Sequence, residues 1–564
     1  MSVGARIGVY VCHCGVNIAA VVDVKQVTEV AAALPGVVVA RDYLYMCSDP
    51  GQALITRDIA EYGLDRVVVA SCSPRMHEPT FRQAAQAAGL NPYLVEMANV
   101  REQCAWVHTD RAAATEKAMR LVASAVAKAG LLTPLEDREA QVNPGALVIG
   151  GGIAGMAAAL DVADAGFPVY LVERSDRLGG HVAELNRTFP TLEAAADLLE
   201  PLIARVQAHP GITVLLGTQV TGVDGYVGNF TVEVAPPPSE AVGIRVGAVI
   251  VATGYDGFNP RHKPEYGYGE CPNVITSLEM EQRLLAGDLA VNGRTPRSVA
   301  FVQCVGSRDA QAGHPYCSRV CCMVSAKQAQ LVRDLLPQAS VTVFFTDVRT
   351  FGLGAEEFYD QTRAKGVRYR RGSVSEVYRR GERVVVAAED TLLGRSLDHE
   401  ADLVVLAVGM APRADAGAVA GLLKLPRSAD GFLLEAHPKL RPVDTAVSGV
   451  FLAGCCQAPK DIPDTVAQAR AAASSALIPL LRGAVPIESA TAVVDADLCA
   501  GCGACVQVCP SGAAALDARW SVCRVNSVLC EGCGACASAC PSKAIGLQHY
   551  TAEQMLAQAE ALAA

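Results

Sequence analysis

The chain has 564 residues, of which 51% are hydrophobic, and a formal net charge of -10. A chain of this length folds into several domains with cores of their own, and its negative charge argues against nucleic acid as a partner, since phosphate backbones are bound by an excess of Lys and Arg. No apolar run reaches the roughly 18 residues of a membrane helix, and the first residues lack the pattern of a secretory signal. We therefore expect a cytoplasmic protein without a membrane span.

The 21 cysteines of the chain lie in clusters along the sequence. Cytosolic thiols are kept reduced, so a disulfide framework is not expected in this compartment. The clusters instead indicate metal ligands. Exposed thiolates and metal clusters are damaged by oxidants, which favours an anaerobic or protected setting.

Residues 1–135 are predicted to form an amino-terminal α/β domain, in which hydrophobic runs typical of strands alternate with helical patterns. Five cysteines lie at or just beyond the ends of these elements, and such ends meet at one edge of a parallel sheet. Four of the five are predicted to hold one [4Fe-4S] cluster. Because none forms a C-x-x-C pair, a set of buried structural thiols is the alternative. The five are Cys12, Cys14, Cys47, Cys72 and Cys104.

Residues 144–485 are predicted to form a flavoprotein core that begins with a dinucleotide-binding unit. A strand over 146–149 is followed by Gly150, Gly152 and Gly155 in the pattern G-x-G-x-x-G, then by a helix and a second strand that ends at Glu173. The glycines allow a tight turn and the approach of a pyrophosphate to the helix N-terminus, while the acid bonds a ribose hydroxyl.

The later part of this core contains the Ala-Thr-Gly turn at which two-dinucleotide-domain flavoproteins return toward FAD, which favours FAD over NAD at the first site. Such flavoproteins also place Gly-Asp after a late strand, whereas this chain has Gly454 followed by Cys455. The helix that begins near Thr465 is expected to aim its N-terminal amides at the flavin. The predicted FAD-binding residues are Gly150, Gly152, Ile153, Ala154, Gly155, Glu173, Arg174, Gly180, His181, Thr253, Gly254, Gly454, Asp464 and Thr465.

A second nucleotide-binding unit is expected after the strand at 298–302, but its turn lacks the glycine pattern. Four cysteines follow instead: Cys304, Cys317, Cys321 and Cys322. Four thiolates satisfy the four irons of a cubane, so a cluster is predicted in place of nicotinamide; a redox-active disulfide of the adjacent pair is the rival.

Lys327 lies on the helix predicted to begin at the adjacent cysteines. It is the candidate catalytic residue, a cation between this cluster and the flavin that stabilises the reduced flavin by its charge. The alternative is an ordinary solvated lysine on a helix.

Residues 487–550 contain the pattern C-x-x-C-x-x-C-x-x-x-C-P twice, which is typical of two-cluster ferredoxins, where the fourth cysteine of each run ligates the other cluster. A zinc site would have no use for the third and fourth cysteines. Residues 551–564 are predicted to be a short amphipathic helix that serves packing. One cluster is assigned to Cys499, Cys502, Cys505 and Cys540, and the other to Cys530, Cys533, Cys536 and Cys509.

Taken together, the chain resembles the A subunit of heterodisulfide reductase over nearly its whole length. The resemblance rests on Cys-His-Cys-Gly near the start, on stretches 71–81 and 452–465, on the glycine unit, on the four core cysteines and on the ferredoxin repeat. Some members of that family carry a further ferredoxin insertion in the core. Here residues 255–297 contain only Cys271, so that electron route is missing.

The resemblance implies an α/β fold with a thioredoxin-reductase-like core of two dinucleotide domains and a C-terminal α+β ferredoxin module. It implies an oxidoreductase subunit in which FAD exchanges electrons with four [4Fe-4S] clusters, with flavin-based electron bifurcation as in the best-known members. The partners implied are B- and C-like subunits, a hydrogenase or dehydrogenase module and ferredoxin, in a dimer within a larger complex. The alternatives are a pyridine-nucleotide-dependent disulfide oxidoreductase with a fused ferredoxin, or a scaffold subunit that carries clusters.

Overall fold

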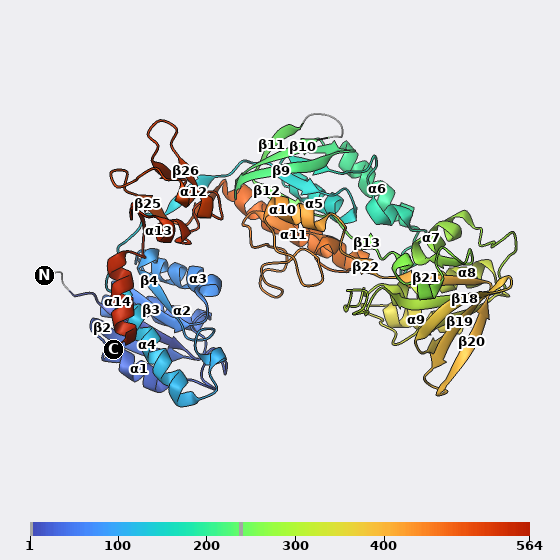
Figure 1. Ribbon diagram of the computed structural model, residues 1–564, viewed down its shortest axis with the longest axis horizontal. Helices are drawn as coiled ribbons and strands as arrows, with labels where there is room; N and C mark the ends of the chain where they lie inside the picture. Colours follow the sequence, from blue (N-terminus) through green and yellow to red (C-terminus); the bar gives the residue numbers. More distant parts are fainter. Residues whose placement is uncertain (1–3, 236–240, 564) are drawn as a thin grey trace. The chain divides into compact units, whose positions relative to one another are not determined.

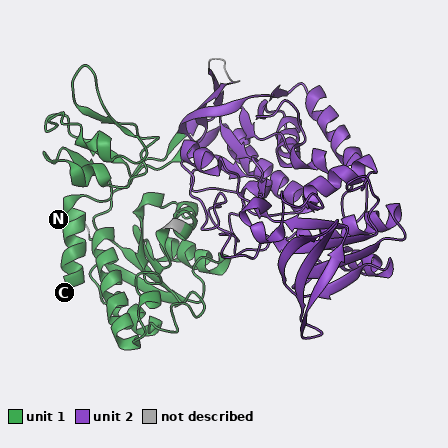
Figure 2. Cartoon of the chain, turned by 45° about the vertical axis from the view of Figure 1, so that its right-hand side comes forward, with its two compact units in different colours: residues 1–139, 486–564 green, residues 140–485 purple. Residues whose placement is uncertain are grey.

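The computed structural model describes residues 4–235 and 241–563, and the chain forms two compact units (Figure 2). The first unit contains residues 1–139 together with 486–564, and the second contains residues 140–485. The two ends of the chain, which the sequence presents as separate domains, thus belong to one unit. The elements follow one another in the order shown by colour in Figure 1.

The amino-terminal part of unit 1 is a four-stranded parallel sheet in the order β2-β1-β3-β4. Residues of β1 and β3 are almost all buried, as expected for a parallel sheet with helices on both faces. One core cluster includes residues of α1 and α4, and another includes residues of α2 and α3. The elements are β1 Ile7–Cys12, α1 Val24–Ala32, β2 Val37–Tyr43, α2 Asp49–Tyr62, β3 Arg66–Ser71, α3 Pro74–Ala87, β4 Val95–Asn99 and α4 Arg111–Ala129.

The carboxy-terminal part of unit 1 is the predicted ferredoxin module followed by a helix, α14 (Ala552–Ala563). Its short strands pair antiparallel, β25 with β28 and β26 with β27. Helix α14 packs on α4, where the Gln554 side chain donates to the carbonyl of Leu131 at 3.0 Å. The tail therefore packs against the amino-terminal part of unit 1. The module consists of β25 Ala492–Val494, α12 Ala504–Val508, β26 Ala514–Leu516, β27 Cys523–Val525, α13 Ala535–Ala539 and β28 Ile545–Leu547.

Unit 2 contains two five-stranded parallel sheets, each with a three-stranded antiparallel sheet from the same stretch of chain. The first has the order β23-β12-β6-β7-β8 and the second β14-β21-β15-β16-β17. This is the predicted pair of dinucleotide-domain folds. The first is built from β6 Ala146–Ile149, α5 Ile153–Asp164, β7 Val169–Val172, α6 Ala195–Ala208, β8 Ile212–Leu215, β9 Gln219–Tyr226, β10 Asn229–Ala235, β11 Val242–Val246, β12 Ala248–Val251, α10 Ala416–Leu423, β23 Val450–Leu452 and α11 Ile462–Arg482.

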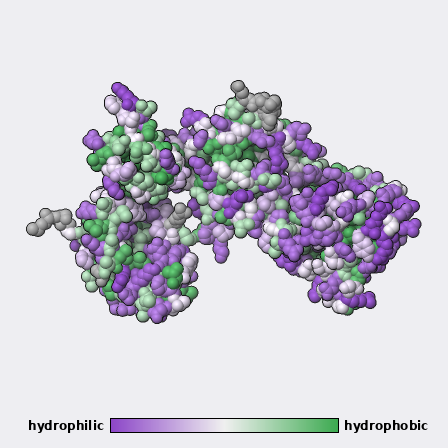
Figure 3. All heavy atoms as spheres, in the orientation of Figure 1, coloured by the Kyte–Doolittle hydropathy of each residue, from purple (hydrophilic) through white to green (hydrophobic). Residues whose placement is uncertain are grey.

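The second domain of unit 2 carries the core cysteines at the end of β15 and the start of α8. Its antiparallel sheet β18-β19-β20 exposes paired charges such as Arg383 with Glu400, and Figure 3 shows a mainly hydrophilic surface over it. The domain consists of β14 Val274–Thr276, α7 Ser277–Ala286, β15 Ser298–Val305, α8 Cys321–Leu335, β16 Ser340–Phe345, α9 Ala355–Ala364, β17 Arg368–Arg371, β18 Val374–Arg380, β19 Arg383–Asp390, β20 Arg395–Ala401 and β21 Leu403–Val408. The remaining strands form two-stranded sheets. They are β13 Asp256–Gly257 with β22 Met410–Ala411, and β5 Arg138–Gln141 with β24 Ala484–Ile487.

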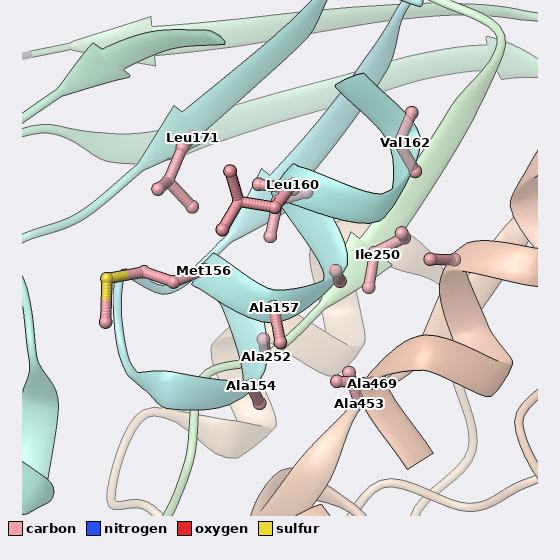
Figure 4. Close-up of a cluster of buried hydrophobic side chains, with 14 of the residues drawn as sticks. Ala154, Met156, Ala157, Leu160, Val162, Leu171, Ile250, Ala252, Ala453 and Ala469 are labelled. Carbon is pink, nitrogen blue, oxygen red and sulfur yellow. The ribbon is translucent and has the colours of Figure 1, made fainter. Parts of the chain in front are cut away.

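Small residues set the packing of α5, the helix that follows the glycine turn. Ala157 of α5 and Ala469 of α11 are buried in one cluster with Ile250 of β12 (Figure 4). Alanines without long side chains let α5 approach both the sheet and α11. This close packing holds the N-terminus of α5 at the carboxyl end of β6, where a dinucleotide is bound in such folds.

None of the helices within residues 4–235 and 241–563 is both long and apolar enough to cross a membrane.

Candidate functional site

A cavity of about 530 Å³ lies in unit 2 beside the glycine turn. Its wall is formed by the turn itself, the end of β7, the segment after β12 and the starts of α8 and α11. Most of the predicted FAD-binding residues line it: Gly150, Gly152, Ile153, Ala154, Glu173, Arg174, Gly180, His181, Thr253, Gly254 and Thr465.

The three glycines of the turn differ in what they do. Gly150 has a φ of 115°, in the left-handed region, and a Cβ there would collide with the carbonyl of Ala252. A Cβ on Gly155 would collide with the carbonyl oxygen of Gly150, so this glycine packs the helix onto the turn and does not line the cavity. At Gly152 the nearest atom to a Cβ is the Cα of Gly180, 4.0 Å away. Gly152 therefore leaves open space for a ligand.

Glu173 lines the cavity, and its carboxylate is fixed by hydrogen bonds. One oxygen accepts a hydrogen bond from the Gly151 amide at 2.6 Å, and the other accepts from the amide and hydroxyl of Ser175 at 2.8 and 2.5 Å. The adjacent Arg174 pairs with Asp415 at 3.1 Å. A held carboxylate in this position is suited to accept ribose hydroxyls of an adenosine.

Tyr255, Cys321, Cys455 and Lys460 also line the cavity. The ring of His181 lies 4.3 Å from that of Tyr255, and its Nε2 lies 2.9 Å from the Tyr255 carbonyl oxygen. Burial raises the pKa of the Tyr255 hydroxyl, so the phenol stays protonated.

Two predicted residues, Gly454 in the turn before α11 and Asp464 in its first turn, lie outside the cavity wall. Gly454 donates its amide to the Gln468 side chain at 2.8 Å, and Asp464 pairs with Arg319 at 2.6 Å. Asp461 lines the cavity instead, because it is the N-cap of α11 and accepts from the Asp464 amide at 2.9 Å. The sequence alone did not show that Asp461, and not the predicted Asp464, caps the helix and lines the cavity.

Lys460 also lines the cavity and was missed from the sequence. Its ammonium donates to the Gln457 side chain at 2.5 Å and to the carbonyls of Ala458 at 3.1 Å and Gly454 at 3.4 Å. All three acceptors are neutral, and burial lowers its pKa. Lys460 and the N-terminus of α11 thus lie together in the cavity wall, beside the Asp461 carboxylate.

The structure brings the four core cysteines together. Burial is the main cause that raises the pKa of the Cys321 thiol. The negative charges of its neighbours Cys304, Cys322 and Cys317 raise this pKa further. Cys321 also lines the cavity, so the thiol group and the cavity are adjacent. The Arg319 amide donates to Cys317 Sγ at 3.3 Å, and such bonds to sulfur tune the potential of a cluster.

Lys327 is buried on α8, with a side chain only 1% exposed. Its ammonium lies 2.7 Å from Glu281 and donates to the Arg187 carbonyl at 2.6 Å, and burial lowers its pKa. The alternative of a solvated lysine is therefore wrong. Lys327 does not line the cavity, whereas its partner Glu281 does.

In the amino-terminal domain, four of the five candidate cysteines form one group. Cys12 Sγ accepts from the amides of Cys14 at 3.3 Å and Met46 at 3.4 Å. Burial and then the charge of Cys14 raise the pKa of the Cys47 thiol. Burial, partly offset by the nearby Arg101, raises the pKa of Cys72 to about 11, with Cys14 and Cys12 adding to the rise.

Cys104 lies apart from this group. Its thiol donates to the Ala114 carbonyl of α4 at 3.1 Å, and the residue is fully buried in the apolar core between the sheet and the helices. Four of the five cysteines were expected to act together, without a choice among them. The structure sets Cys104 apart as a buried core thiol and leaves Cys12, Cys14, Cys47 and Cys72 as one set of four.

In the ferredoxin module a small pocket is lined by Cys509, Cys530, Cys533 and Cys536. These are one of the two predicted ligand sets, with the fourth cysteine contributed by the other run. Backbone amides point at the sulfurs, from Ala513 to Cys509 at 3.2 Å and from Ala492 to Cys530 at 3.5 Å. Within the described residues, no three Cys, His, Asp or Glu side chains converge as the ligands of a single ion; a cubane instead takes one thiolate on each iron.

Comparison with known proteins adds two family matches and a set of relatives. Residues 145–300 match the pyridine nucleotide-disulphide oxidoreductase family, and residues 498–544 match the 4Fe-4S dicluster domain. The chain is 47% identical to an iron-sulfur A subunit of the CoB–CoM heterodisulfide reductase of Methanopyrus kandleri, with 90% of each chain covered.

The chain is also 46% identical to the A subunit of the H2:CoB-CoM heterodisulfide,ferredoxin reductase of Methanothermobacter marburgensis, with 99% of this chain and 97% of the relative covered. That alignment runs over 641 positions, so the relative holds residues that this chain lacks. Among solved structures, a thioredoxin reductase from T. acidophilum aligns with 60% of this chain and 99% of its own length, at 18% identity and a TM-score of 0.41.

Proposed function

Since the chain belongs to the family of heterodisulfide reductase A subunits, we propose that it is an electron-transfer subunit in which FAD exchanges electrons directly with a [4Fe-4S] cluster beside it. The observation that carries this proposal is the position of Cys321, which lines the FAD cavity and belongs to the group of four core cysteines. Electron transfer between the two cofactors then needs no mobile carrier.

The residues of the cavity fit FAD along its whole length. Glu173 would accept the adenosine ribose, Gly150, Gly152 and the N-terminus of α5 would hold the pyrophosphate, and Thr465 with Lys460 would border the isoalloxazine. FAD supplies the ability to exchange electrons both singly and in pairs. The residues of the chain bind and orient it and place positive charge at one end, which favours the reduced, more negative flavin.

Four [4Fe-4S] clusters are proposed per chain, two in the ferredoxin module and one each at the core and amino-terminal cysteine groups. The amide-to-sulfur hydrogen bonds at Cys12, Cys317, Cys509 and Cys530 support this proposal. The proposed domains are residues 1–135 with one cluster, residues 144–485 with FAD and one cluster, residues 487–550 with two clusters, and a helix at residues 551–564.

The names of the relatives suggest the wider system. They describe reductases that act on H2, formate, ferredoxin and the CoB–CoM heterodisulfide. We propose that this chain likewise works in the cytoplasm of an anaerobe, as a dimer with B- and C-like subunits, a hydrogenase or dehydrogenase module and ferredoxin. Electron bifurcation at the flavin is part of this proposal.

The Cys322→Ser variant tests the proposal. The full chain should keep its FAD but lose about four irons, and chemically reduced ferredoxin should then reduce the flavin much more slowly than in the wild type. The matched control is Ser325→Ala on the same helix, which removes a hydroxyl and no ligand. An unchanged rate of flavin reduction in Cys322→Ser, measured by stopped-flow absorbance, would contradict the proposal.

The second candidate function is a pyridine-nucleotide-dependent reductase, which the family match over 145–300 favours. The end of β15 and the loop after it contain Cys304 and Cys317 in place of the G-x-G-x-x-G pattern, so we expect NADH alone to reduce the flavin poorly. The measurement is flavin absorbance after anaerobic mixing with NADH, with dithionite as the positive control. Rapid bleaching by NADH would favour the pyridine-nucleotide reductase.

A further inference from the structure

The two halves of the ferredoxin module are repeats, and the structure preserves their equivalence. Cys499 and Cys530 begin the two cysteine runs, and each is preceded by a short strand that starts seven residues earlier, β25 at Ala492 and β27 at Cys523. Positions 492 and 523 are therefore equivalent. One carries a methyl group and the other a thiol.

Both positions touch a predicted cluster site in the same way. The Ala492 amide donates to Cys530 Sγ at 3.5 Å, and the Cys523 amide donates to Cys499 Sγ at 3.3 Å. Ala492 also lines the pocket bounded by Cys509, Cys530, Cys533 and Cys536. By the repeat, the side chain of Cys523 faces the other ligand set.

The burial of Cys523 agrees with this placement. The residue is 3% exposed and lies in the core cluster that also contains Cys505 and Cys540, two ligands of that set. Its thiol contacts the side chain of Cys505, and it reaches the Arg524 carbonyl only at a long 3.8 Å. The S–H group is thus buried beside the ligands and only weakly engaged by the backbone.

We propose that the Cys523 thiol is a ninth, non-ligating cysteine of the module that donates an S–H hydrogen bond to a sulfur of the cluster held by Cys499, Cys502, Cys505 and Cys540. It is a positioning residue that makes the two clusters unequal. A hydrogen bond to sulfur stabilises the extra negative charge of the reduced cluster and so raises its reduction potential. The methyl of Ala492 cannot do this for the other cluster.

The consequence is a direction for electron flow within the module. The cluster beside Cys523 accepts an electron first, and the cluster beside Ala492 is the stronger reductant of the pair. This inference rests on the two clusters proposed for the module, but not on the FAD site or on bifurcation.

The test is a redox titration of the full chain followed by EPR, in wild type and three variants. Cys523→Ala should lower the potential of one cluster toward that of the other, with no loss of iron. Cys523→Ser keeps an O–H donor and should keep the two potentials apart. Ala492→Cys adds a donor to the second half and should raise the potential of the other cluster.

Two results would overturn the inference. Unchanged potentials in Cys523→Ala would show that the thiol does not act on a cluster, and the loss of about four irons would show that Cys523 is a ligand. Failure of the proposed function looks different, because wild-type protein would then show no pair of [4Fe-4S] signals from the module.

Discussion

The Gly152→Val variant should fold and keep its clusters but bind no FAD. The backbone of Gly152 has φ -76° and ψ -178°, which valine adopts without strain, and the nearest atom to a Cβ is 4.0 Å away. The added methyl groups therefore enter the cavity, where they occupy the space that the pyrophosphate needs against the backbone. The flavin absorbance of anaerobically purified protein measures the effect.

Gly243→Val is the matched control for this variant. Gly243 also has open space around its Cβ, but it is an exposed residue of β11 outside the cavity, so this variant should bind FAD normally. Retention of stoichiometric FAD by Gly152→Val would contradict the assignment of the cavity. Gly155 offers no such test, because a Cβ there would collide with the Gly150 carbonyl and disturb the fold itself.

The Glu281→Leu variant should lower the free energy of unfolding of unit 2 by about 3–5 kcal/mol, since it leaves the charge of Lys327 buried without its partner. Glu281 and Lys327 are each 1% exposed at the side chain and lie 2.7 Å apart. The substitution also removes the acceptor for the Asn186 amide and the Gln328 side chain. Denaturant unfolding of the full chain, followed by fluorescence, measures the loss.

Two further variants test the cause of this loss. Glu281→Leu combined with Lys327→Met removes both charges and should recover much of the stability. Lys365→Met breaks an exposed pair with Asp334 and should cost at most about 1 kcal/mol. A loss in Glu281→Leu no larger than in Lys365→Met would show that the buried pair does not stabilise the domain.

The sequence predicted the parts of the fold that depend on local patterns. The glycine turn with Glu173, the strand-end thiols and the double ferredoxin run each carry their geometry in a short stretch of chain, and the structure places them accordingly. The two-domain core was predicted from the resemblance to the family. The pairing of residues 1–139 with 486–564 was not predicted, because it depends on contacts such as α14 with α4 between distant segments.

The details of the site that the sequence left open have a common physical cause. Residue spacing alone does not determine the exact rotation of an element. That rotation decides whether Cys104 faces the sheet edge or the helical core, and whether Asp461 or Asp464 faces the cavity. Lys327 was placed on the correct helix, but its partner Glu281 comes from α7. Lys460 lies in the stretch 452–465 that carries the resemblance, but only the folded chain shows that it lines the cavity. Cys523 was missed because it belongs to no recognised motif.

The most direct measurement of the central claim is the iron and FAD content of the chain, purified without oxygen. The proposed four cubanes require about sixteen irons per chain, together with one FAD. That result, with the loss of about four irons in Cys322→Ser, would support a flavin adjoining a cluster. A content near eight irons would leave only the ferredoxin module, and would contradict the account.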